Sequence, residues 1–183
     1  RPAVEGDRLY LVGNGDDRRT SIVLSLALSD GSNQWSKELD QNVRIGLGVE
    51  DDTIYHGDID GLFVARDAAD GSERWRAQLP ERSWISTIPR RFGGRVWVGT
   101  LSGDLYGLTE AGIETHVERA GSTTPVVGDG RLYVGSSAFH DSRGRVDTVV
   151  AIDAEGTELW RTETRGRPNA QVGYRDGAVF AAT

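Results

Sequence analysis

Residues 43–75 read VRIGLGVEDDTIYHGDIDGLFVARDAADGSERW, and related stretches recur along the chain. Residues 86–116 read STIPRRFGGRVWVGTLSGDLYGLTEAGIETH, and residues 124–160 read TPVVGDGRLYVGSSAFHDSRGRVDTVVAIDAEGTELW. A further copy opens the chain with PAVEGDRLYLVG and VLSLALSDGSNQW, and another starts near residue 169 with AQVGYRDGAVFAAT. Self-similarity with a period of roughly 20–50 residues is the signature of a repeat architecture, so this repeat decides the fold.

Two anchors fix the register of these copies. The first is a glycine four residues before an aromatic residue or a histidine, at Gly31 and Trp35, Gly71 and Trp75, Gly112 and His116, and Gly156 and Trp160. The second is a Gly or Asp turn that leads into β-branched and aromatic residues, as in residues 52–55 and 130–133. Successive glycines of the first anchor lie 40, 41 and 44 residues apart. We therefore expect a single domain of about four and a half repeats, over residues 1–42, 43–84, 85–122, 123–168 and 169–183.

Each repeat predicts four strands. In the fourth copy, residues 125–127, 132–134 and 148–152 are three strands, and a fourth begins at residues 159–161. No segment has useful helical periodicity, and short strands with frequent turns are typical of a sandwich or a propeller. The regular period favours the propeller, in which each blade is one four-stranded antiparallel sheet. The predicted fold class is therefore all-β, as a β-propeller.

Composition and charge exclude several functions. The chain has 24 Gly and 5 Pro among 183 residues, which suits many tight turns, and it has no Cys for thiolate chemistry or disulfides. Its net charge of −7 argues against nucleic acid as a partner. Of the 21 basic residues only Lys37 is a lysine. An acidic, Arg-biased surface is typical of halophilic proteins, with GC-biased codon usage as the alternative.

The pattern Ala-x-Asp-x-x-x-Gly-x-x-x-Trp resembles the tryptophan-docking motif of the PQQ-like (quinoprotein) repeat family. Ala65, Asp67, Gly71 and Trp75 match it in full. The partial matches are Ala151, Asp153, Gly156 and Trp160, with a turn that is one residue shorter, and Gly31 with Trp35. The resemblance covers essentially the whole chain. It implies that these residues dock one blade onto the next, because a large aromatic ring can lie flat against Ala or Gly.

Members of this family include quinone-dependent dehydrogenases and non-enzymatic scaffolds, such as the lipoprotein of outer-membrane β-barrel assembly. The resemblance implies that an alcohol-oxidising member would use adjacent cysteines, calcium-binding carboxylates and an aspartate base. The chain has no Cys, and Asp58-Ile59-Asp60-Gly61 lacks the later Glu of an EF-hand calcium loop. His56, His116 and His140 share no spacing across the repeats, so no metal site is predicted.

We expect a non-catalytic scaffold without a cofactor, PQQ being compatible only with a completed ring. A sensor domain of a membrane-bound signalling protein and a quinone-dependent dehydrogenase remain alternatives.

Departures from the repeat predict where a protein partner or small ligand binds. Insertions between the second and third strands occur at residues 14–20 and 138–145. In a propeller these hairpins share one face with the segments that connect blades, and loops on a rigid scaffold often carry function. A tolerated insertion on a solvated rim is the alternative interpretation. The candidate residues of this loop face are Asp17, Arg18, Arg19, Trp84, Phe139, His140 and Arg143.

The last repeat offers two strands, so a strand edge is left for pairing. We expect this edge to pair with further repeats, in a ring of seven or eight blades, or with a second chain. The family resemblance favours an extracytoplasmic or cell-surface location.

Overall fold

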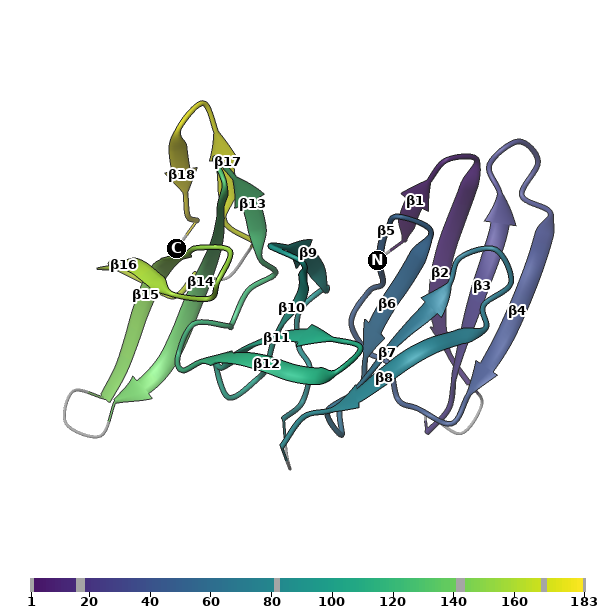
Figure 1. Ribbon diagram of the computed structural model, residues 1–183, viewed down its shortest axis with the longest axis horizontal. Coiled ribbons are helices and arrows are strands. Elements are labelled where there is room, and N and C mark those ends of the chain that lie inside the picture. The colour runs from purple at the N-terminus through teal and green to yellow at the C-terminus, as the bar shows by residue number, and fades with distance from the viewer. Residues whose placement is uncertain (1, 16–18, 81–82, 141–143, 169–170, 183) are drawn as a thin grey trace. The chain divides into compact units, whose positions relative to one another are not determined.

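The computed structural model describes residues 2–15, 19–80, 83–140, 144–168 and 171–182, which form 18 β-strands and the turns between them (Figure 1). No helix occurs in these ranges, so the described part of the chain has no helix that could span a membrane. The strands form four four-stranded antiparallel sheets and one two-stranded sheet, each made of consecutive strands. The predicted all-β class is confirmed.

The strand boundaries follow the repeat. The first sheet contains β1 (Ala3–Glu5), β2 (Arg8–Asn14), β3 (Ser21–Ala27) and β4 (Asn33–Leu39). The second contains β5 (Gly48–Glu50), β6 (Thr53–Gly57), β7 (Leu62–Asp67) and β8 (Glu73–Gln78). The third contains β9 (Arg90–Phe92), β10 (Arg95–Gly99), β11 (Leu105–Thr109) and β12 (Gly112–Val117). The fourth contains β13 (Val126–Gly128), β14 (Arg131–His140), β15 (Gly144–Ile152) and β16 (Glu158–Glu163). The two-stranded sheet contains β17 (Gly173–Arg175) and β18 (Ala178–Phe180).

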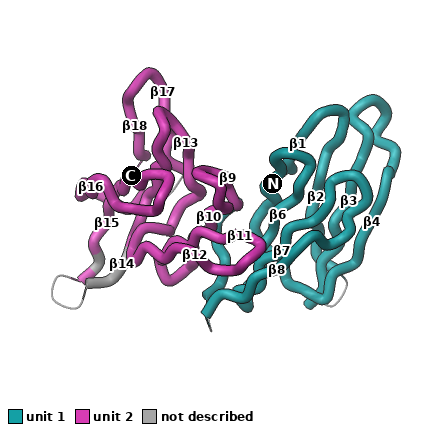
Figure 2. Tube along the Cα trace, viewed as in Figure 1, with its two compact units in different colours: residues 1–88 teal, residues 89–183 magenta. Residues whose placement is uncertain are grey.

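The chain divides into two compact units (Figure 2). Unit 1 is Arg1–Ile88 and holds the first two sheets, whereas unit 2 is Pro89–Thr183 and holds the others. Each unit buries its own core, because the sheets present apolar faces to one another. In unit 1, Ile54 of the second sheet packs against Tyr10, Val23 and Leu39 of the first. In unit 2, Leu132, Val134, Val150 and Ile152 of the fourth sheet pack in one cluster with Trp97 and Leu105 of the third.

The turn before each second strand forms as the sequence predicts. Asp129 and Gly130 both have positive φ, at 49° and 64°, and they join β13 to β14. Two left-handed residues give the hairpin a twist that matches the flanking strands, which is why Gly is favoured there. The second strand that follows is central in its sheet, and β6 is buried at every position. Burial on both faces also explains the unbroken apolar run Val96-Trp97-Val98 of β10, in which all three residues are buried.

The docking motif has a fixed register in three of the sheets. Each motif tryptophan lies opposite a small residue of the neighbouring strand, in the pairs Ser25 with Trp35, Ala65 with Trp75, and Ala151 with Trp160. A β-bulge follows the small residue in every case. The motif aspartates hold the turn between the third and fourth strands. Asp67 accepts a hydrogen bond from the backbone of Ala69, and Asp153 accepts from Glu155 and Thr157.

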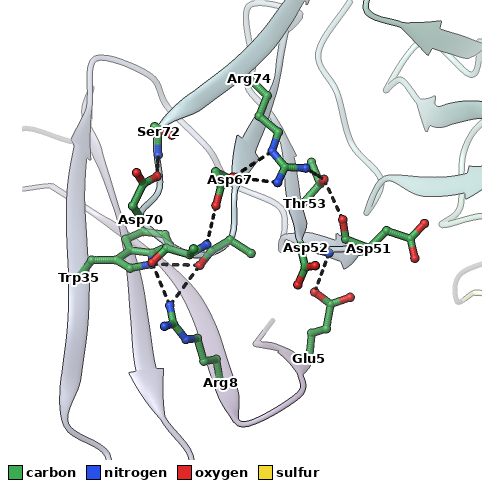
Figure 3. Close-up of polar contacts among 12 residues, drawn as sticks. Glu5, Arg8, Trp35, Asp51, Asp52, Thr53, Asp67, Asp70, Ser72 and Arg74 are labelled. Atoms are coloured by element: carbon green, nitrogen blue, oxygen red, sulfur yellow. Dashed lines mark hydrogen bonds and ion pairs between the residues drawn. The ribbon is translucent and has the colours of Figure 1, made fainter.

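Trp35 connects the two sheets of unit 1. Its indole Nε1 donates to the carbonyl of Ala68, at 3.1 Å, in the β7–β8 turn of the second sheet (Figure 3). Gly71 of the same turn leaves room for the indole, since a Cβ there would lie 2.8 Å from Trp35 Cζ3. Trp75 instead contacts Phe63 of its own sheet, with ring centroids 5.2 Å apart. Trp160 lies 6.0 Å from Tyr133 and is 37% exposed.

The third sheet departs from the expected register. His116 was predicted to hold the place of a docking tryptophan, but the residue opposite the small Gly107 is Thr115. The turn in this repeat is shorter, which moves the register, and His116 stacks on Tyr106 at 4.6 Å. Thr115 lies against Gly156 of the fourth sheet, and so does the buried indole of Trp97 on β10. The aromatic group that docks here therefore comes from the second strand of the sheet.

At the second insertion the strands are longer than the sequence predicted. The strands β14 and β15 extend into it and pair as far as His140 and Gly144. The fourth sheet therefore has the longer second and third strands, whereas β2 and β3 of the first sheet pair as far as Asn14 and Ser21.

Candidate functional site

The predicted loop face lies at one end of each sheet. Because neighbouring strands are antiparallel, the β2–β3 and β6–β7 loops share this end with the segments that connect successive sheets. Arg19 is exposed there. Phe139 and His140 form the end of β14, and only their backbone is described. The predicted residues Asp17, Arg18 and Arg143 lie outside the described residues.

Trp84 has a defined partner on the loop face of unit 1. The guanidinium carbon of Arg44 lies 5.9 Å from the centre of the Trp84 ring, within cation–π distance. Arg44 Nε donates to Asn42 Oδ1 at 3.1 Å, so the exposed guanidinium is held from two sides. Among the described residues no carboxylate pairs with Arg44. The sequence singled out Trp84, but nothing in it indicated the role of Arg44.

The β6–β7 loop is hydrogen-bonded to the two segments that carry this pair. The buried carboxylate of Asp58 accepts from the backbone of Asp60 at 2.9 Å and of Leu62 at 2.8 Å. Burial raises the pKa of Asp58, and these hydrogen bonds oppose that rise. The loop also binds the two segments that connect sheets, because Ile59 donates to the Asn42 carbonyl and Ile85 donates to the Asp58 carbonyl. Asp58 thus orders a loop that is hydrogen-bonded to the segments that carry Arg44 and Trp84.

The opposite end of unit 1 holds a cavity of about 440 Å³ that the sequence did not indicate. It lies between the β1–β2 turn and the turns of the second sheet, and its lining includes Glu5, Asp7, Arg8, Asp52 and Arg74. Figure 3 shows the polar contacts around it. The sequence could not indicate it, because its lining combines turn residues of two blades that come together only in the folded unit.

The described residues assemble no metal site. Within them, no group of three or more His, Asp or Glu side chains is placed to hold a metal ion. His56 is fully buried in unit 1, and His116 stacks on Tyr106 in unit 2. The chain also has no Cys, so it lacks the adjacent cysteines that the family resemblance implied for an alcohol-oxidising member.

Comparisons with known proteins agree with this fold. BamB from Moraxella catarrhalis matches with a TM-score of 0.79 and 20% identity, over 100% of this chain and 54% of that one. A quinohemoprotein alcohol dehydrogenase from Comamonas testosteroni matches with a TM-score of 0.70 and 16% identity, over 88% of this chain and 34% of the enzyme. The computationally designed Ika8 protein matches with a TM-score of 0.71 and 14% identity, over 97% of this chain and 53% of the design.

The chain therefore spans about half or less of each of these structures. No curated protein sequence matches it. A family model described as outer membrane protein assembly factor BamB matches residues 19–146. The chain therefore belongs to this PQQ-like β-propeller repeat family, and each of its four-stranded sheets is a propeller blade.

Proposed function

We propose that this chain is a non-catalytic scaffold that binds a partner polypeptide through its loop face. The observation that carries the proposal is the Arg44–Trp84 pair, a guanidinium fixed on an indole with no carboxylate to neutralise it among the described residues. Arg and Trp are the residue types most enriched in the energetic centres of protein interfaces. The similarity to BamB, an assembly factor, supports a protein partner and an extracytoplasmic location.

The pair suits binding because its geometry is set before a partner arrives. Arg44 is held by Asn42 and by the Trp84 ring, so little side-chain freedom is left to lose on association. The β6–β7 loop, which is hydrogen-bonded to the segments that carry the pair, is itself ordered by the hydrogen bonds of Asp58. An unpaired guanidinium donates to carbonyl or carboxylate groups of a partner through its terminal nitrogens.

Quantitative affinity capture from the source cells tests this proposal. Wild-type protein and the Arg44→Gln and Trp84→Phe variants serve as baits, with Arg175→Gln as the control because Arg175 is an exposed arginine of unit 2. We expect at least one protein to be captured by the wild type and the control and to be lost with both loop-face variants. That protein, once purified, should bind the wild type directly. Equal capture by all four baits would contradict the proposal.

A quinone-dependent dehydrogenase is the alternative with the most specific support, because such an enzyme is among the structural matches. Titration with PQQ and calcium, followed by an assay for dye-linked alcohol oxidation, separates the two. Saturable PQQ binding with turnover would replace the scaffold by an enzyme.

A further inference from the structure

The cavity of unit 1 is lined by charged groups whose hydrogen-bonding capacity the fold uses only in part. It lies at the end of the two blades opposite the loop face, and its rim includes the carboxylates of Glu5, Asp7 and Asp52. Glu5 accepts one hydrogen bond, from the backbone of Asp52 at 3.2 Å. None of the three has an ion-pair partner in the described part of the chain.

The cavity lining includes the guanidinium of Arg8, which uses only some of its hydrogen-bond donors. Arg8 Nη1 donates to the carbonyl of Ala69 at 2.9 Å and to that of Ala68 at 3.4 Å, which fixes the side chain (Figure 3). Its Nε and Nη2 have no partner among the described residues. Arg74, by contrast, donates hydrogen bonds to the carboxylate of Asp67 and to the hydroxyl of Thr53. The cavity therefore offers one open guanidinium edge beside three unpaired carboxylates.

The blade pair of unit 2 is a natural control for this arrangement. Arg95 holds the position of Arg8 and likewise donates to a turn carbonyl, that of Ala154 at 2.9 Å. There, however, Arg95 is neutralised by Glu114 at 3.1 Å, and the turn at Gly93 lies directly against Ala154. In unit 1 a Cβ on Gly6, the counterpart of Gly93, would meet no atom within 4 Å. In unit 2 this arginine therefore has a carboxylate partner and its turn is packed against the next blade. In unit 1 the equivalent turn leaves a cavity, and Arg8 has no carboxylate partner among the described residues.

The carboxylates also depart from the repeat. Asp7 and Asp52 occupy the second position of the turn between the first two strands, where later repeats have Gly94, Gly130 and Gly177. Asp52 adopts the left-handed conformation, with φ of 53°, which glycine takes at lower cost. A charged residue therefore replaces the conformationally favoured one at the rim of the cavity.

We propose that this cavity binds a small amino compound that also carries an anionic group, of the basic amino-acid type. Its ammonium groups lie among Glu5, Asp7 and Asp52, and its carboxylate accepts from the open edge of Arg8. A volume of about 440 Å³ falls in the range of small-molecule sites. Asp67 is a fourth carboxylate of the lining, and the two guanidinium groups are those of Arg8 and Arg74. The lining therefore has a surplus of negative charge, which a ligand with a net positive charge would balance.

Isothermal titration calorimetry at low ionic strength tests the proposal, with L-lysine, 1,5-diaminopentane and glutarate as probes. Lysine carries both kinds of group, the diamine lacks the carboxylate, and glutarate lacks the amines. We expect lysine to bind most tightly, the diamine more weakly, and glutarate not at all. Asp52→Gly and Asp7→Asn should each weaken lysine binding by about fivefold or more. Asp129→Asn is the matched control, because Asp129 lies in the equivalent turn of unit 2, outside the cavity.

Three outcomes would overturn the proposal. They are the absence of saturable lysine binding at millimolar concentration, equal binding of glutarate and lysine, and equal weakening by Asp129→Asn and Asp52→Gly. Circular dichroism of each variant confirms that the fold is retained. The loop-face proposal does not depend on any of these results, because its residues lie at the other end of unit 1.

Discussion

At the scale of single residues, the most unusual feature is a polar pair inside the blade 1–blade 2 core. His56 is fully buried, and its Nε2 accepts from Arg66 Nε at 3.0 Å, while its Nδ1 has no partner. Both residues replace apolar ones, since the equivalent positions of the next two repeats are Val98 and Val134 for His56, and Leu108 and Ile152 for Arg66. Burial, and then the charge of Arg66, lower the pKa of His56 to about 3.

The buried His56–Arg66 pair predicts that the fold loses stability as the pH falls. In the unfolded chain His56 has a pKa of 6.5, so below that pH the unfolded chain takes up a proton that the folded chain excludes. The stability of the fold therefore falls between pH 6.5 and about 3, and about 2 kcal/mol of this loss occurs between pH 7 and pH 5. The double variant His56→Val, Arg66→Leu restores the apolar pair and should lack this loss. Urea unfolding at the two pH values measures it, and identical pH dependence of the two proteins would contradict a neutral, buried His56.

Sequence patterns identify residues that repeat but not residues that pair only in space. Gly71 and Trp35 were found because each recurs at a fixed spacing, and the structure brings them into contact across two blades. His56 and Arg66 each occur once, ten positions apart, and nothing in the sequence shows that β6 and β7 place them side by side in a core. The open edge of Arg8 could not be predicted for a different reason: arginine recurs at this position, as in Arg95 and Arg131, and the sequence does not show which copy has a carboxylate partner.

At the scale of elements, the β7–β8 turn and its contact with β4 can be tested by a matched glycine pair. Gly31 and Gly71 have nearly equal φ, of 72° and 74°. A Cβ on Gly31 would meet nothing within 4 Å, whereas a Cβ on Gly71 would lie 2.8 Å from Trp35 and 2.9 Å from Lys37. Both alanine variants carry the left-handed backbone cost of about 1–2 kcal/mol. We expect Gly71→Ala to lose a further 1–3 kcal/mol, roughly, because the docked indole must move.

Urea unfolding of the two variants gives this difference directly. Equal losses in both would show that Trp35 does not need the space above Gly71.

The strands could be predicted from the sequence, but their exact ends could not. Apolar runs and turn residues located the strands of the fourth repeat, and the fixed period carried the same four-strand pattern to the other repeats. The register of β12 was wrong, since the bulge after Gly107 and the shorter turn together place Thr115 where a tryptophan was expected. The β14–β15 hairpin was longer than predicted because its polar residues, such as Ser136 and Thr148, still pair across the two strands.

At the scale of the whole molecule, the repeat predicts the sheets, while what lies between the sheets depends on how closely neighbouring turns approach. In unit 2, Gly93 lies directly against Ala154. In unit 1, the corresponding turns stand apart and leave the cavity beside Arg8. This difference depends on two blades at once, and a single repeat carries no information about it.

The net charge of the molecule leads to a last prediction, on salt. The chain carries 28 acidic and 21 basic residues, so its folded form concentrates a surplus of negative charge. Salt shortens the range of the resulting repulsion from about 30 Å at 0.01 M to about 3 Å at 1 M. If the acidic, Arg-biased composition is a halophilic adaptation, Tm should rise by on the order of 5 °C from dilute buffer to molar potassium chloride. Most of the rise should occur below about 0.3 M, where screening is already strong, whereas salting-out would act mainly above that. A flat Tm over the series would leave codon bias as the explanation for the missing lysines.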